Sequence, residues 1–187
     1  NIWADNVISY RNRIVSDVEL MPVSFDRRNY VSVDSGMIRR MYLGLKEYSS
    51  SVKKAIHMMD SDRPDVMHVC TSASISLTKD IMLLRAAKKR GIKSIIHFHF
   101  GRIPELIKKN NWEWKLLKKC ADLADVAITM DMKSYKVLKH KGYHTVYCPN
   151  PLSLAIIEQI EKEKGSIARI PGKLLFIGHV LPSKGVY

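Results

Sequence analysis

The sequence predicts an α/β fold of the Rossmann-like class, in which helices cover both faces of a parallel sheet. Short, almost continuously apolar segments alternate with longer segments whose apolar residues recur every three or four positions. This alternation is typical of parallel strands joined by helical crossovers. The composition, with 46% hydrophobic and 26% charged residues in a chain of 187, excludes collagen-like and wholly disordered proteins.

The first half of the chain contains three predicted strands and two predicted helices. Residues 18–25 alternate apolar and polar side chains and indicate a strand that Pro22 confines to an edge or a bend, and a polar loop follows at 27–36. Apolar residues spaced by three and four predict a helix at 37–59. The remaining segments are a strand at 66–71, a helix at 74–90 and a strand at 94–100.

The second half continues the alternation and then changes character. Its predicted elements are one or two helices at 104–123, a strand at 126–130, a helix at 132–141, a strand at 145–148 and a charged helix at 154–164. A new apolar strand begins at Lys173 and has no partner strand after it. We therefore expect a Rossmann-like domain at 1–152, whose first strand precedes Asn1, and an incomplete second domain that opens within 153–187.

The positive charge is concentrated in one zone. The formal net charge is +13, and the segment from Arg85 to Lys141 contains 15 basic and 5 acidic residues. Such a zone fits nucleic acid, an anionic membrane surface, a phosphorylated substrate, or simply solvated lysine-rich helix faces. No zinc finger, helix-turn-helix or RNP-type motif accompanies it, so nucleic acid is not the expected partner.

Cysteine usage and hydropathy predict a cytoplasmic protein. Three cysteines without a close pair favour reduced thiols. No apolar run reaches the ~18 residues that a membrane span requires, and the first ten residues do not resemble a signal peptide.

Two histidines near the end of a predicted strand are candidate functional residues. Alternation puts His97 and His99 on the same face of the strand, and His99 lies nearer the carboxyl edge, where ligands bind in open α/β sheets. Gly101 and the cationic Arg102 follow. We expect His97 to be a core residue and His99 to face a ligand. No metal site is expected, because no cysteine or carboxylate nearby in the sequence completes the ligand set.

Two further segments carry candidate binding groups. In the segment 176–185, a buried strand ends at Gly178 and a loop leads to Lys184, an arrangement that suits a phosphate group but is also common in solvated turns. The P-loop order of residues is absent. The hydroxyl groups in the segment 71–74 are explained by capping of the helix that follows.

Five segments in order resemble the N-terminal half of the retaining glycosyltransferases of family four, which have the GT-B fold. They are residues 63–69 (RPDVMHV), the strand end 99–101 (HFG), residues 124–129 (ADVAIT) followed by Ser134, residues 146–151 (VYCPNP) and residues 176–186 (FIGHVLPSKGV). The resemblance implies two Rossmann-like domains, of which the first binds the acceptor and the second binds the nucleotide-sugar.

The resemblance also implies a reaction: metal-independent transfer of a sugar, with retention, to an unidentified acceptor in glycan or cell-envelope polysaccharide synthesis. No cofactor is expected. The implied partners are a nucleotide-sugar donor, a glycan or lipid-linked acceptor, and the inner face of an anionic membrane. The implied site consists of the catalytic His99, the donor-phosphate residues Gly178, His179 and Lys184, and the acceptor-side residues Ser72, Arg102 and Asn150.

One site residue departs from the family pattern, and two other functions stay open. His179 stands where the family usually has an arginine, which alters the phosphate contact. We expect the 187 residues to be inactive without the rest of the donor domain. The alternatives are a non-catalytic Rossmann-like domain that binds a phosphorylated ligand, and a basic nucleic-acid-binding module with steeply salt-dependent affinity.

Overall fold

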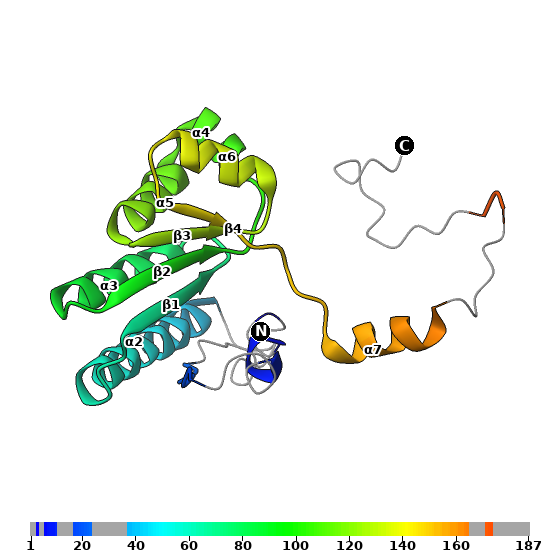
Figure 1. Ribbon diagram of the computed structural model, residues 1–187. Coiled ribbons are helices and arrows are strands. Elements are labelled where there is room, and N and C mark those ends of the chain that lie inside the picture. Colours follow the sequence, from blue (N-terminus) through cyan, green and yellow to red (C-terminus); the bar gives the residue numbers. More distant parts are fainter. Residues whose placement is uncertain (1–2, 4–5, 11–16, 24–36, 165–170, 174–187) are drawn as a thin grey trace. The chain divides into compact units, whose positions relative to one another are not determined.

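The computed structural model describes residues 3, 6–10, 17–23, 37–164 and 171–173 (Figure 1). The chain divides into two compact units, one formed by residues 17–150 and the other by residues 1–16 together with 151–187. The predicted domain boundary at residue 152 stays a prediction.

Residues 17–150 contain a four-stranded parallel sheet with the strand order β1-β2-β3-β4. Its strands are β1 (Val66–Thr71), β2 (Lys93–Phe98), β3 (Val126–Thr129) and β4 (Thr145–Tyr147). All three pairings are parallel, so the carboxyl ends of the strands meet at one edge. With the flanking helices, this arrangement confirms the predicted α/β, Rossmann-like fold class. The sequence predicted helices on both faces of the sheet, whereas the described helices that connect its strands pack on one face, because consecutive strands are neighbours.

Five helices accompany the strands in the described part of this unit: α2 (Met37–Ser61), α3 (Ser76–Lys89), α4 (Ile103–Lys109), α5 (Trp112–Leu123) and α6 (Met132–His140). The segment predicted to hold one or two helices forms two. Asn110 ends α4 in the left-handed conformation, with φ of 45°. Asn111 then begins α5, because its side chain accepts a hydrogen bond from the backbone of Trp114 at 3.0 Å.

Two strand predictions need correction. Residues 18–23 are not a strand, since Pro22 lacks the N–H group that a sheet ladder requires. The strand β2 ends at Phe98 rather than at residue 100, because its pairing with β3 ends where Phe98 lies opposite Thr129. The predicted loop at 27–36 and the predicted strand after Lys173 lie outside the described residues.

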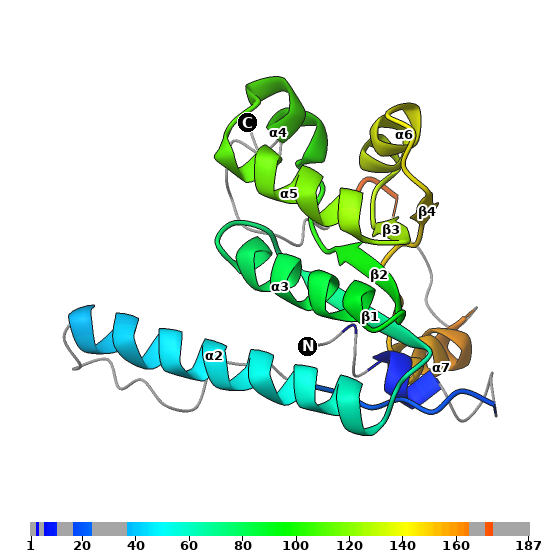
Figure 2. The same cartoon turned by 90° about the vertical axis from the view of Figure 1, so that its left-hand side faces the viewer.

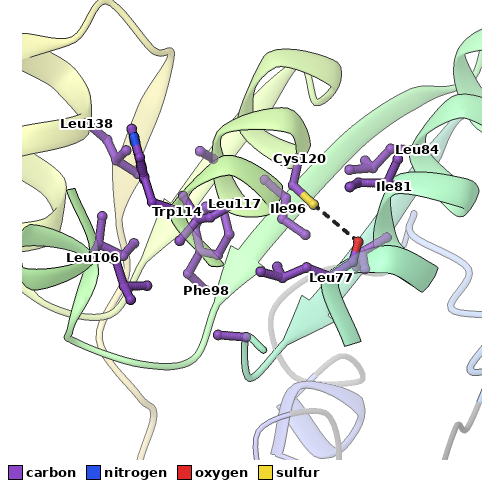
Figure 3. Close-up of a cluster of buried hydrophobic side chains, with 14 residues drawn as sticks. Leu77, Ile81, Leu84, Ile96, Phe98, Leu106, Trp114, Leu117, Cys120 and Leu138 are labelled. Carbon is purple, nitrogen blue, oxygen red and sulfur yellow. Dashed lines mark hydrogen bonds between the residues drawn. The ribbon is translucent and has the colours of Figure 1, made fainter. Parts of the chain in front are cut away.

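The hydrophobic core of residues 17–150 lies on one face of the sheet (Figures 2 and 3). Register and alternation put four buried strand residues on this face, namely Val69, Ile96, Phe98 and Ala127. They pack against side chains from α3, α4, α5 and α6, including the fully buried Leu77 and Leu117. Right-handed crossovers between consecutive neighbouring strands put every connecting helix on the same side. The other face therefore presents the alternate strand residues, among them His68, Cys70 and His97.

The second unit is small in its described part. Residues 6–10 are helical, and α7 spans Leu154–Glu163 after the cap residue Ser153. Asn6 donates a side-chain hydrogen bond to the carbonyl of Pro151 at 3.4 Å, and the hydroxyl of Tyr10 donates to the carbonyl of Leu152 at 3.2 Å. These two contacts join the N-terminal helix to the segment that precedes α7. In both units, the described helices are too short or too polar for any of them to cross a membrane.

Candidate functional site

The loop after β1 has an unusual backbone conformation at the carboxyl edge of the sheet. Ala73 and Ser74 both occupy the left-handed region, with φ of 74° and 66°, which is costly for residues with a Cβ atom. The hydroxyl of Thr71 accepts a hydrogen bond from the backbone N–H of Ala73 at 3.3 Å, and the hydroxyl of Ser76 donates to the carbonyl of Ala73 at 2.6 Å. These hydroxyl groups shape the loop.

The sequence predicted that the hydroxyl groups of residues 71–74 cap the following helix. That prediction is wrong. The N-cap position of α3 is Ile75, and it has no side-chain capping bond. The predicted acceptor-side residue Ser72 lies in this loop and is exposed. Its hydroxyl is therefore accessible to a ligand at the carboxyl edge.

A buried carboxylate connects this loop to the loop after β2. Glu113, in the first turn of α5, is only 6% exposed. Its Oε1 atom accepts hydrogen bonds from the backbone N–H of Ser74 at 3.0 Å and from Nη2 of Arg102 at 2.7 Å. Sequence reasoning identified Arg102 but missed Glu113, whose only local signal was an acidic residue between two tryptophans in a lysine-rich segment.

His99 lies where the sequence predicted, just beyond the end of β2. Its backbone N–H donates to the carbonyl of Thr71 at 2.9 Å, so the chain still follows the sheet at this point. The ring is half-buried, and the side chain of Asn150 forms a hydrogen bond with it. Burial lowers the pKa of His99 below its ordinary value, while the Asn150 hydrogen bond raises it. The lowered pKa keeps the ring neutral at pH 7, where it can both donate and accept a hydrogen bond.

His97 is fully buried, as predicted, but it lies on the face of the sheet opposite the hydrophobic core. Burial, together with smaller contributions from the nearby His99 and His68, lowers its pKa to about 3. Its ring lies 4.0 Å, centroid to centroid, from the ring of His99. The two rings are therefore in contact, and His99 lies nearer the carboxyl edge.

A second carboxylate lies near Gly101, in the loop after β3. Asp131 begins α6, and its Oδ1 atom accepts from the backbone N–H of Ser134 at 2.8 Å. Its Oδ2 atom is buried and has no hydrogen-bond partner among the described residues. A Cβ atom added at Gly101 would lie 3.4 Å from this oxygen. The glycine thus keeps the space beside the carboxylate open.

The structure brings part of the predicted site together. His99 contacts Asn150, and Arg102 is joined through Glu113 to the loop that contains Ser72. The predicted donor-phosphate residues Gly178, His179 and Lys184 lie outside the described residues. No protein-family model, curated protein or solved structure matches this chain.

The basic zone is a solvent-exposed surface. All 15 lysine and arginine residues from Arg85 to Lys141 are exposed, although the side chain of Arg90 is partly covered. Among the described residues, Arg90, Lys93, Arg102 and Lys118 of this zone form ion pairs with carboxylates. The other basic residues of the zone form no ion pair with a described carboxylate, so their charge is available to an anionic partner.

Proposed function

We propose that residues 17–150 are the acceptor-binding domain of a retaining glycosyltransferase that takes its sugar from a nucleotide-sugar. The observation that supports this most directly is the position of His99. It lies at the carboxyl edge of a parallel sheet, and its ring forms a hydrogen bond with Asn150. The neighbouring strand β1 ends in a loop whose backbone donates a hydrogen bond to Glu113, and Glu113 also contacts Arg102. In open parallel α/β sheets this edge is where ligands bind.

The polar groups at this edge suit recognition of a sugar. A neutral His99 ring can form a directed hydrogen bond with a sugar hydroxyl. Arg102 is tied to Glu113 through one nitrogen, and its side chain remains 54% exposed, so its other N–H groups can contact an anionic or hydroxylated acceptor. Loss of a nucleoside diphosphate also requires positive charge near the leaving phosphates. The resemblance assigns that role to Lys184 and His179.

An activity assay tests the proposal. The protein, expressed with any natural extension of its chain, is incubated with a panel of nucleotide-sugars and with glycan and lipid-linked acceptors, and release of nucleoside diphosphate is measured. We expect His99→Ala to lower turnover by about a hundredfold or more, as for the loss of one preorganised hydrogen bond. The exposed His140 on α6 provides the control variant His140→Ala. Equal turnover in the two variants would remove His99 from the site.

Binding of nucleoside diphosphate tests the donor side separately. Loss of a charge-assisted contact of ~1.5–3 kcal/mol in Lys184→Ala implies roughly ten- to a hundredfold weaker binding by calorimetry. Unchanged affinity would exclude Lys184 as the phosphate ligand. Tight binding of a phosphorylated ligand without any transfer would favour the non-catalytic alternative. The proposal also places the protein in the cytoplasm, with its basic surface toward anionic lipid.

A further inference from the structure

Three potential metal ligands meet on the face of the sheet opposite the hydrophobic core. Parallel pairing of β1 and β2 places Cys70 directly opposite His97. His68 precedes Cys70 by two positions, so its side chain lies on the same face of β1. No metal site was expected from the sequence, because no cysteine or carboxylate lies near His97 and His99 along the chain. Strand pairing supplies that cysteine from a different segment.

The distances suit a single ion. One donor atom from each of His68, Cys70 and His97 lies within 4.8 Å of the other two. The rings of His68 and His97 are 5.5 Å apart between centroids and are inclined by 18°. Two imidazoles bound to one tetrahedral zinc ion, with Zn–N bonds of about 2.0–2.1 Å, have ring centres roughly 5 Å apart. Small side-chain rotations would therefore bring the three donor atoms into coordination.

We propose that His68, Cys70 and His97 bind one divalent transition-metal ion of the zinc class, with the fourth position open to water. Two imidazole nitrogens and one thiolate form a donor set that zinc prefers over calcium or magnesium, whose ligands are oxygens. Among the described residues, this is the one group of three such side chains close enough to share an ion.

The three residues differ in burial, so the proposed site has a buried side and a side that is open to solvent. His97 is fully buried, Cys70 is half-buried, and His68 is exposed. Both strands belong to the sheet, whose pairing fixes their register. An ion can therefore reach Cys70 and His97 from the solvent side at His68. The inference is independent of the proposed function, because none of the three residues is assigned to sugar transfer.

Titration with Co²⁺ under reducing conditions tests the proposal directly. A thiolate bound to Co²⁺ produces a charge-transfer band in the near ultraviolet, and tetrahedral coordination produces intense visible bands. We expect both sets of bands to saturate at one ion per chain and to disappear when Zn²⁺ is added. A chain that shows no such bands would overturn the proposal.

Matched variants identify the ligands. Cys70→Ser should remove the near-ultraviolet band, whereas Cys148→Ser, at a half-buried cysteine after β4, should keep it. His68→Ala should weaken Zn²⁺ binding on the order of tenfold or more, while His140→Ala should leave it unchanged. Both target residues lie outside the buried core, and circular dichroism verifies that the variants fold. Retention of the band in Cys70→Ser, or equal affinities in the two histidine variants, would refute this ligand set.

Discussion

The carboxylate of Glu113 accepts a hydrogen bond from the backbone N–H of Ser74 at 3.0 Å, which joins the first turn of α5 to the loop after β1. Ser74 and its neighbour Ala73 both have left-handed backbone conformations. Each costs about 1–2 kcal/mol relative to an ordinary conformation. The bond to a buried carboxylate offsets part of this cost and holds the loop at the candidate site.

Glu113→Ala should therefore lower the free energy of unfolding by about 1–3 kcal/mol, because a backbone donor loses its buried acceptor. Glu113→Gln should cost less, since the amide oxygen still accepts from Ser74 although the charged contact with Arg102 is lost. Urea denaturation measures both changes. The control is Glu105→Ala in the exposed first turn of α4, which should change stability by about 0.5 kcal/mol or less. Equal effects at the two positions would show that the Ser74 contact does not stabilise the loop.

The buried thiol of Cys120 predicts a loss of stability at alkaline pH. Cys120 is fully buried, and its Sγ atom donates to the carbonyl of Leu77 at 3.7 Å (Figure 3). Burial, with a smaller contribution from the charge of Asp80, raises the pKa of this thiol to about 12. In the unfolded chain, the pKa of a cysteine thiol is about 8.5. The folded state thus holds the proton more tightly, and the associated stability is present below this pH and is lost as the pH rises toward 12.

The expected slope is about 1.4 kcal/mol per pH unit, so between pH 8.5 and 10 the wild type should lose roughly 2 kcal/mol more than Cys120→Ala. Urea denaturation across this range measures the difference. Cys148→Ala, at a half-buried cysteine, serves as the control and should keep the wild-type slope. If Cys120→Ala retains that slope as well, the alkaline loss comes from another group.

Gly91 ends α3 in a conformation that favours glycine. Its φ is 70°, and a Cβ atom added there would meet nothing within 4 Å, so the cost of a side chain comes from the backbone alone. Gly91→Ala should lower stability by about 1 kcal/mol, and Gly91→Asn by less, because asparagine tolerates the left-handed region. Thermal denaturation measures both. A Gly91→Ala variant as stable as the wild type would contradict this explanation of how the helix ends.

The exposed lysines of α4, α5 and α6 predict binding to anionic membranes. Each lysine near an anionic surface contributes about 1 kcal/mol, and Trp112, which is 54% exposed at the start of α5, adds an amphipathic ring. We expect sedimentation with phosphatidylserine-containing vesicles at low salt and release at high salt. The double variant Lys108→Gln/Lys109→Gln should weaken binding on the order of tenfold.

The matched control is Lys53→Gln/Lys54→Gln on α2, where both lysines are also exposed. It should leave vesicle binding nearly unchanged. If the chain does not sediment with anionic vesicles at low salt, the basic zone consists of solvated helix faces and the membrane prediction fails.

Local sequence patterns were sufficient for most of the helices and strands. The strand β1 has its predicted bounds, and Gly91 and Gly142 follow α3 and α6 closely, because backbone preferences and apolar periodicity act over short distances. The segment at 18–23 was predicted incorrectly. Its alternation resembles that of a strand, but whether a strand forms depends on a neighbour with which to pair, and alternation within the segment does not reveal one.

The candidate site was predictable only where strand position determined it. His99 follows from alternation and from its place at the end of a strand. Glu113 and Asp131 do not, since their importance comes from contacts with distant segments: Glu113 meets the loop after β1, and Asp131 lies beside Gly101. A carboxylate in a charged segment looks the same in sequence whether it is solvated or buried.

By itself, the sequence determined the α/β class, the order of the elements and the carboxyl edge on which His99 lies, because short-range periodicity and the geometry of parallel strands govern all three. The tertiary structure decided which residues meet. Pairing of β1 with β2 placed Cys70 opposite His97, and docking of α5 buried Glu113 beneath the β1 loop. These contacts depend on which strands become neighbours and how helices pack on them, and that choice is made by the burial of the whole core.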